Sequence, residues 1–184
     1  MSEQNASVYT TVECGRCGVC CTEPIVPVTD SDVLRLSLAL KKPASQLVKF
    51  WSTKEMEYDP DADLWIKFPQ GKRTMGLIKK HSRCMFLTED KCCSVYLHRP
   101  MTCRTFPYAI DLDDNDQPCK VELNKIVSCS CKRKKRSALK DVIENVKLEL
   151  DKDDQYYDKI SEWNSKEAPG GTREFLKFLG LSAW

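Results

Sequence analysis

The sequence predicts an α+β fold: a small, irregular, cysteine-rich core with short antiparallel strands and flanking helices, extended by helices at the C-terminal end. Three observations predict it. Eleven cysteines in 184 residues gather in stretches rich in turn-forming residues. Short apolar runs between these stretches have the length of strands, and apolar residues recur at helical spacing in the last third of the chain. We expect a cysteine-cluster domain over residues 1–131 and a helical extension over residues 132–184 that packs on the same domain.

The composition is that of a chain with a core of its own and a balanced charge. Hydrophobic residues make up 41% of the chain, and 29 basic against 27 acidic residues leave a formal net charge of +2. This balance gives no electrostatic reason to expect a nucleic-acid or membrane partner. We interpret the basic run K-R-K-K-R at residues 132–136 as a solvated stretch before a helix. With neither a secretory signal nor a segment long enough to cross a bilayer, we expect a cytoplasmic protein of undetermined oligomeric state.

The first cysteine group, C-G-R-C-G-V-C-C at residues 14–21, repeats the Cys-x-x-Cys spacing. In a reducing cytoplasm thiols persist, and an odd number of cysteines fits disulfide pairing badly, so metal binding is the better interpretation. Cys-x-x-Cys brings two thiolates close enough to share one zinc ion or one face of an iron–sulfur cluster. Neighbouring side chains such as Cys20 and Cys21 should diverge, which indicates two adjacent centres or one multinuclear centre.

The first predicted helix follows this group. Thr29 has the position of an N-cap, and Asp32 has that of its capping-box partner. Apolar residues then recur as far as Lys42, and Pro43 stops the helix. A short second helix is predicted over residues 44–51.

The middle of the chain predicts strands and a second cysteine group. L-W-I-K-F and T-M-G-L-I-K-K flank the turn-like P-Q-G-K-R, which predicts a hairpin over residues 64–80. The second cysteine group follows among turn residues and prolines, as in metal-binding loops, and consists of Cys84, Cys92, Cys93 and Cys103. A second strand pair is predicted at residues 108–112 and 120–127, and it leads to Cys129 and Cys131.

The last third of the chain predicts two helices. Ser137 can cap a helix that runs to about Trp163, with apolar residues at helical spacing. S-K-E-A-P-G-G at residues 165–171 breaks it, and T-R-E-F-L-K-F-L-G-L at residues 172–181 predicts a short amphipathic helix. Because this region has no cysteine, we expect it to cover the metal-binding core.

Other polar residues near the cysteines have less specific contexts. His81 and His98 could be metal ligands, but enough thiols exist without them, and we favour a non-ligand role. Arg99 and Arg104 could donate hydrogen bonds to sulfur or carboxylate groups, and their turn contexts favour a buried role. The chain lacks a P-loop, a G-x-G-x-x-G loop, an H-E-x-x-H motif and a C-x-x-x-C-x-x-C triplet. We therefore assign no catalytic residue, and whether the protein is an enzyme stays open.

Taken together, the two cysteine groups resemble the YkgJ-type cysteine-cluster family, the CxxCxxCC zinc- or iron-chelating domain. The matching segments are C-G-R-C-G-V-C-C, V-T-D-S-D-V-L-R-L, C-M-F-L from Cys84 and C-S-V-Y-L-H-R-P-M-T-C-R-T-F-P at residues 93–107, and the resemblance covers roughly residues 10–131. It implies metal ligands at Cys14, Cys17, Cys20, Cys21, Cys84, Cys93 and Cys103. The eighth is Cys129 or Cys131, of which we select Cys129, although neither precedes the proline usual in the family. Cys92 and Cys119 have no family counterpart, and we interpret them as a spare thiol and a structural or surface cysteine.

Three functions fit these observations. The first hypothesis is an iron–sulfur protein that works in electron transfer, or as an accessory to a redox or methyl-transfer enzyme, with a protein partner. The second is a binuclear zinc module that stabilises a small domain or holds a partner. The third, a protein lysine N-methylase, is implied only by the resemblance, because the domain also occurs in flagellin lysine N-methylases. We favour iron over zinc because of the adjacent cysteines, although zinc also satisfies all-cysteine sites.

Overall fold

The computed structural model describes residues 11–13, 17–22, 25–56, 59, 61–115, 118–123, 132–134 and 139–181. The helices are α1 (Asp30–Leu40), α2 (Met101–Thr105), α3 (Leu139–Asn164) and α4 (Thr172–Phe178), with short 3-10 turns η1 (Val19–Cys21), η2 (Ala44–Gln46) and η3 (Tyr96–His98). The strands pair antiparallel as β1 (Thr11–Glu13) with β8 (Lys132–Lys134), β2 (Val48–Ser52) with β3 (Arg73–Leu77), β4 (Lys79–Lys80) with β5 (Arg83–Cys84), and β6 (Tyr108–Leu112) with β7 (Pro118–Leu123). The predicted α+β class is confirmed.

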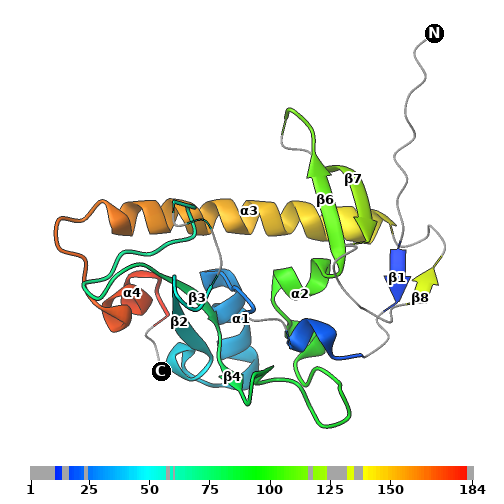
Figure 1. Ribbon diagram of the computed structural model, residues 1–184, viewed down its shortest axis with the longest axis horizontal. Coiled ribbons are helices and arrows are strands. Elements are labelled where there is room, and N and C mark those ends of the chain that lie inside the picture. Colours follow the sequence, from blue (N-terminus) through cyan, green and yellow to red (C-terminus); the bar gives the residue numbers. More distant parts are fainter. Residues whose placement is uncertain are drawn as a thin grey trace.

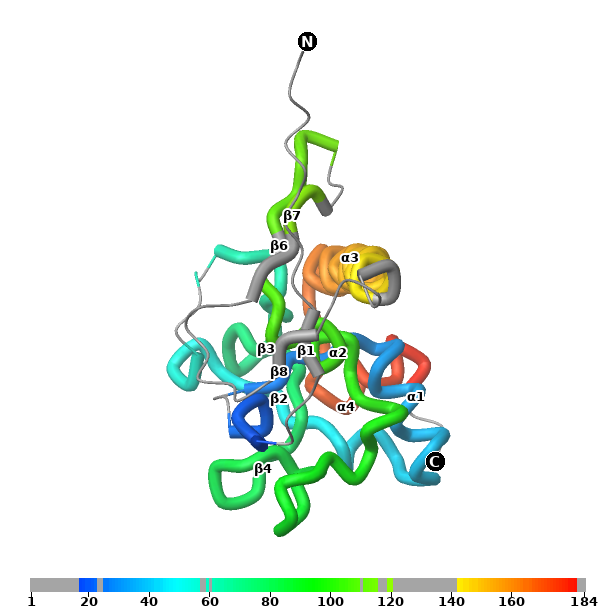
Figure 2. The backbone as a smooth tube through the Cα atoms, turned by 90° about the vertical axis from the view of Figure 1, so that its right-hand side faces the viewer, coloured from blue at the N-terminus to red at the C-terminus, as the bar shows by residue number. Residues whose placement is uncertain are grey.

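The long helix α3 runs along one side of the molecule, and α1, α2, α4 and the β2–β3 pair lie beneath it (Figure 1). Figure 2 looks nearly along α3 and shows the β6–β7 hairpin standing away from the other elements. Among the helices of the described residues, none combines the length and the apolar content that crossing a bilayer requires. The cysteine-bearing segments η1, β5 and α2 are short, and the regular elements around them fix their positions.

Helix α1 begins as its sequence predicts. The Thr29 hydroxyl accepts a hydrogen bond from the Asp32 backbone N–H at 3.3 Å, and the Asp32 carboxylate accepts one from the Thr29 N–H at 3.5 Å. This reciprocal pair satisfies two N–H groups that the first helical turn leaves without a partner. The helix ends at Leu40, where Lys41 takes a left-handed conformation with φ of 51°. Its inner face buries Val33 and Leu36 completely.

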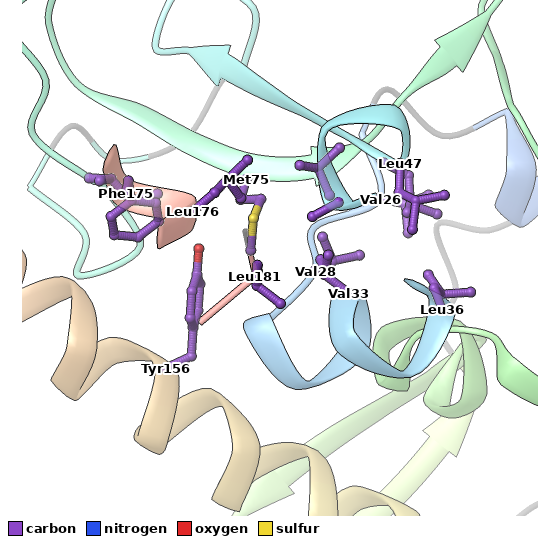
Figure 3. Close-up of a cluster of buried hydrophobic side chains, with 14 of the residues drawn as sticks. Val26, Val28, Val33, Leu36, Leu47, Met75, Tyr156, Phe175, Leu176 and Leu181 are labelled. Carbon is purple, nitrogen blue, oxygen red and sulfur yellow. The ribbon is translucent and has the colours of Figure 1, made fainter. Parts of the chain in front are cut away.

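An apolar layer joins α3 and α4 to the β2–β3 pair. Phe175 of α4 is fully buried and makes an edge-on contact with the Trp163 ring of α3 at 5.1 Å between centroids. Phe68 meets the Phe175 ring edge-on at 5.8 Å, and Phe50 of β2 meets Phe68 at 5.3 Å. Figure 3 shows how this layer continues through Met75 of β3 towards Val33 of α1 and towards Val28 in the loop before that helix. The C-terminal helices therefore share one core with the rest of the described chain.

The helix predicted over residues 44–51 is wrong. A single 3-10 turn, η2, occupies its first residues, and β2 follows at Val48–Ser52 in register with β3. β-branched and aromatic residues such as Val48, Phe50 and Trp51 favour a strand that packs against a sheet neighbour. Pairing with β3, which lies more than twenty residues further along the chain, is the tertiary contact that a local pattern does not contain.

The hairpin predicted over residues 64–80 is only partly present. Ile66 and Arg73 exchange backbone hydrogen bonds of 2.8 and 3.0 Å, but β3 takes β2 as its strand partner. The first half of the predicted hairpin bonds to the end of α3 instead. The Lys67 N–H donates to the Asn164 side chain at 2.7 Å, and the Trp163 indole donates to the Lys67 carbonyl at 2.9 Å. Side chains of α3 thus bond to the outer edge of this segment, on the side away from Arg73.

The other predicted elements agree with the structure as far as it describes them. Strands β6 and β7 pair at the expected place, and residues 124–127 of the predicted second strand lie outside the described residues. Helix α3 ends at Asn164, one residue beyond the prediction, and α4 covers Thr172–Phe178 of the predicted terminal helix. The predicted cap Ser137 lies outside the described part of the chain.

Candidate metal centre

Turn η1 brings the sulfur atoms of Cys20 and Cys21 close together. Gly18 has a φ of 77°, which L side chains rarely adopt, and its carbonyl accepts the Cys21 N–H at 3.0 Å. The turn leaves the two sulfur atoms 3.8 Å apart, with Cys21 buried. Our expectation that these neighbouring side chains diverge is therefore wrong, because it assumed strand or helix geometry and the residues form a tight 3-10 turn.

Cys84 contributes a third sulfur atom, which forms a hydrogen bond with Cys21. It is buried on β5, which pairs with β4 in a short hairpin, with Lys79 opposite Cys84. A hydrogen bond with Cys21 lowers the pKa of Cys84 to about 7, and burial opposes that shift. The pKa of Cys21 is raised, first by its bonds with Cys20 and Cys84 and then by burial. Of this pair, Cys84 therefore has the lower pKa.

Cys93 and Cys103 complete the group. Cys93 itself forms an antiparallel β-bridge with Leu87, and the next residue, Ser94, donates its N–H to the Phe86 carbonyl at 2.9 Å, which fixes the loop beside β5. Cys103 lies in α2. Burial first, and negative charge on Cys20 and Cys84 second, raise the pKa of Cys103, and burial followed by the same two neighbours raises that of Cys93. These effects place five cysteines within electrostatic reach of one another: Cys20, Cys21, Cys84, Cys93 and Cys103.

Helix α1 and three arginines brace the loop between Cys93 and Cys103. Asp32 is buried, and one of its oxygens accepts from the Arg35 guanidinium at 2.5 Å and from the Met101 N–H at 3.1 Å. Arg35 also donates to the Arg99 carbonyl at 3.0 Å, and Arg104 donates to the same carbonyl at 3.2 Å. Arg99 and Arg104 are half-buried rather than buried, and they shape the loop that carries the cysteines through the Arg99 carbonyl and the Arg104 guanidinium.

The Asp32–Arg35 pair was missed as part of the site, because Asp32 was assigned only a capping role. The sequence did hold a signal. An acid and an arginine three residues apart lie on one helical face, and such a pair can reach a neighbouring R-P turn. Which turn it reaches depends on the fold, since Arg99 lies more than sixty residues away.

The other cysteines and the two histidines named from the sequence lie apart from this group or outside the described residues. Cys17 is half-buried beside η1, whereas Cys14, Cys129 and Cys131 lie outside the described residues. The Cys92 thiol donates to the Asp90 carbonyl at 3.6 Å, and the exposed Cys119 thiol donates to the Asp111 carbonyl at 3.3 Å on the β6–β7 hairpin. His81 and His98 are exposed.

The donor set fits a thiophilic metal. Two thiolates bound at 2.3 Å to one tetrahedral ion lie about 3.8 Å apart, and the Cys20 and Cys21 sulfurs have that separation. Within the ranges that the structure describes, no three Cys, His, Asp or Glu side chains lie close enough to hold one ion as they stand. Cys20 and Cys84 each bond to Cys21, their charges act on Cys93 and Cys103, and the sulfur chemistry suits zinc or iron.

Comparison with known proteins gives two matches. The model of the CxxCxxCC family, described as a "Putative zinc- or iron-chelating domain", matches residues 13–141. The uncharacterized protein MJ0661 of Methanocaldococcus jannaschii is 29% identical over 101 residues, which are 54% of this chain and 46% of that protein. The chain therefore spans less than half the length of this relative. No solved structure matches the chain.

Proposed function

The chain belongs to the CxxCxxCC family of zinc- or iron-chelating domains, and on that premise we propose that its cysteines hold an iron–sulfur cluster used in electron transfer or in support of a redox or methyl-transfer enzyme. Metal binding follows from the family. One feature supports the step to a cluster: Cys20 and Cys84 act on Cys21, Cys93 and Cys103, which makes five cysteines, and one zinc ion takes only four ligands.

The proposed ligands are the cysteines of both groups: Cys14, Cys17, Cys20, Cys21, Cys84, Cys93, Cys103 and Cys129. A bound cluster would supply reversible one-electron transfer. The chain's own part is to gather thiolates. The bond with Cys21 lowers the pKa of Cys84 to about 7, and burial raises the pKa of Cys93, a rise that the Arg99 charge offsets in part. We propose residues 1–131 as the metal-binding domain and residues 132–184 as the extension that covers it.

The test is the metal and sulfide content of protein purified without oxygen, with its visible absorption spectrum. We expect near-equal iron and acid-labile sulfide, and a broad charge-transfer absorption. Cys84→Ser should lower both contents strongly, because Cys84 lies at the centre of the group. Cys119→Ser is the matched control, since this exposed thiol lies on the β6–β7 hairpin. Protein without iron and sulfide, or equal losses in the two variants, would contradict the proposal.

A binuclear zinc module is the second candidate, and the Cys20–Cys21 separation favours it. The 3.8 Å between these sulfurs suits two ligands of the same ion. Zinc at a fixed stoichiometry of about two, with colourless protein, would support this candidate over the cluster. Unfolding of the cysteine loops on chelation would then show that the metal has a structural role.

For a redox role, we propose that an acidic electron-carrier protein docks on turn η3. Leu97 is 80% exposed and Tyr96 is 47% exposed on the loop between Cys93 and Cys103. The Arg99 guanidinium stacks on the Tyr96 ring at 4.1 Å. Arg35 and Arg104 both donate to the Arg99 carbonyl, at 3.0 and 3.2 Å, so the arginines gather here. The exposed apolar side chain of Leu97, with arginines around it, suits a partner with an acidic surface.

Leu97→Ser should slow electron transfer to a small acidic flavodoxin without changing metal content. Leu148→Ser on α3 is the control, because Leu148 is also exposed, at 44%. Transfer should slow as salt rises, because screening weakens attraction between opposite charges. Rates that depend neither on salt nor on Leu97 would contradict docking at this turn.

A further inference from the structure

The sequence holds two pairs of adjacent cysteines, and the structure shapes the two pairs differently. In turn η1 the Cys20 and Cys21 sulfur atoms lie 3.8 Å apart. The Thr22 N–H and hydroxyl both donate to the Val19 carbonyl, at 2.9 and 2.8 Å, and these bonds close the turn that carries the pair. The two sulfur atoms can therefore bind one atom together.

The other adjacent pair, Cys92–Cys93, lies in extended backbone. Cys93 forms the antiparallel bridge with Leu87, and the Cys92 N–H and carbonyl both bond to Thr88. Neighbouring side chains point to opposite faces of such a segment. The Cys92 thiol accordingly donates to the Asp90 carbonyl at 3.6 Å, whereas Cys93 packs against the hydrophobic core. Of the two adjacent pairs, only the first therefore presents its sulfur atoms together.

The number of donors restricts what the first pair can bind by itself. A structural zinc ion takes four ligands, and among the described residues no three Cys, His, Asp or Glu side chains lie close enough to hold one ion. A monosubstituted trivalent arsenical needs only two sulfur ligands, because its third bond is to carbon and a lone pair fills the fourth position. Arsenic in this state is soft, as thiolate sulfur is, so the two form stable bonds.

The surroundings of the first pair suit an uncharged adduct. Cys21 is buried in the hydrophobic core, and Cys20 packs against that core. Burial of an ion in apolar surroundings is costly without further partners, whereas an arsenical held by two sulfur atoms carries no charge. Cys20 is only half-buried, so the pair is not sealed from solvent.

We propose that the adjacent thiols of Cys20 and Cys21 bind monosubstituted trivalent arsenicals as a bidentate ligand. An arsonous acid, R–As(OH)₂, condenses with the two S–H groups: two As–S bonds form, two As–O bonds and two S–H bonds break, and two water molecules leave. Arsenic stays trivalent, so no oxidant or reductant takes part. The two thiols also belong to the proposed metal centre, but the arsenical site does not depend on whether that centre takes iron or zinc.

The test is titration of the full-length, reduced protein, after removal of metal with a chelator, with 4-aminophenylarsonous acid. Mass spectrometry of the intact chain and an assay of free thiols follow the titration. We expect the first equivalent to bind each chain once and to consume two free thiols. Cys20→Ser should weaken this binding at least about a hundredfold, because the second As–S bond and its intramolecular advantage are lost. Cys92→Ser is the matched control, because it removes one thiol from the other adjacent pair, and it should bind like the unmodified protein.

Two further measurements on the unmodified protein need no variant. Excess 2,3-dimercaptopropanol should remove the arsenical, whereas 2-mercaptoethanol at the same thiol concentration should not, because only a dithiol matches a bidentate site. The first equivalent should also slow amide hydrogen exchange in residues 17–22 and leave residues 88–94 unchanged. No uptake of arsenical, release by 2-mercaptoethanol, slower exchange in residues 88–94 instead, or an equal loss of binding in Cys20→Ser and Cys92→Ser would each overturn the proposal.

Discussion

The apolar layer at α4 and the cysteine group at η1 are stabilised in different ways. In the apolar layer, Phe175 is fully buried and its ring meets Trp163, Phe68 and Phe50 at centroid distances between 5.1 and 6.0 Å. At the cysteine group, burial and mutual repulsion oppose ionisation of Cys93 and Cys103. Apolar burial lowers the free energy of the folded state without a ligand, whereas clustered thiols gain most when a metal replaces their protons. The apolar layer is therefore stable without a ligand, whereas the cysteine group gains stability when a metal binds.

The largest effect that separates the two regions should come from removing the metal. Binding free energy at thiolate sites also stabilises the fold, with values of about 10 kcal/mol or more for structural zinc in small peptides. We expect a chelator to raise amide hydrogen exchange in residues 17–22 and 84–103 by at least a hundredfold. Residues 156–179, which contain the aromatic layer, should keep most of their protection. Equal loss of protection in both regions would contradict the comparison.

The converse experiment removes the centre of the apolar layer. Phe175→Ala should lower the free energy of unfolding by about 3–5 kcal/mol, because it deletes a fully buried ring and leaves a cavity. Urea unfolding measures this change. Phe178→Ala provides the control, since Phe178 is only partly buried and should cost less. Metal stoichiometry of the folded variant should stay unchanged, and a loss of metal equal to the loss of stability would show that the two regions are not separate.

Asp32 connects α1 to the loop between Cys93 and Cys103, so its replacement should affect both stability and metal retention. Asp32→Asn weakens the ion pair with Arg35 and the bond from the Met101 N–H. Removing one partner of a fully buried pair costs roughly 3–5 kcal/mol, and partial exposure of Arg35 reduces our expectation to about 2 kcal/mol. Urea unfolding would measure the change, and a competition titration with a chelator should show weaker metal retention. Thr105→Val, a change two residues beyond Cys103 that leaves the ion pair intact, is the control. Unchanged metal retention in Asp32→Asn would show that the brace does not act on the site.

Local signals predicted the parts of the fold that local interactions form. Thr29 and Asp32 specify the start of α1 with side chains three residues apart, and the helical spacing in α3 needs no distant partner. Residues 44–51 were mispredicted because the pairing of Val48 with Leu77 decides their conformation. The two strands pair only when the chain between them folds back. The local sequence of neither strand contains information on this pairing.

At the candidate site, too, the local sequence predicted some features, and others depended on the fold. Spacing and resemblance pointed to the cysteines, and the structure gathers Cys20, Cys21, Cys84, Cys93 and Cys103 as an electrostatic group. The direction of the Cys20 and Cys21 side chains depended on the backbone of Gly18, so a rule for regular elements failed there. Glu149 and Asp153 belong to no sequence motif. Only the packing of α3 over α1 and α2 shows that these carboxyl groups line a cavity.

The smallest effect that we expect concerns pH and the acidic cavity beside the apolar layer. The pKa of Asp153 is about 7 in the folded protein, against an ordinary value of 3.8, chiefly because of burial. A carboxyl group whose pKa is raised on folding stabilises the fold below its unfolded pKa, and that contribution is lost as pH rises through the folded pKa. The free energy of unfolding should therefore fall between about pH 4 and pH 8. After allowance for partial exposure, we expect about 1 kcal/mol from this group.

Asp153→Asn isolates this contribution. Its unfolding free energy should vary less with pH than that of the unmodified protein, so that the variant gains relative stability as pH rises to 8. Glu149, whose pKa burial also raises, leaves a smaller slope in the same direction. The cysteines titrate in both proteins, so their effects cancel in the difference between the two curves. Asp154→Asn should follow the unmodified protein. If the free energy of unfolding of Asp153→Asn and of the unmodified protein varied with pH in parallel, Asp153 would not destabilise the fold when it ionises. The carboxyl groups of the cavity would then have no special effect on stability.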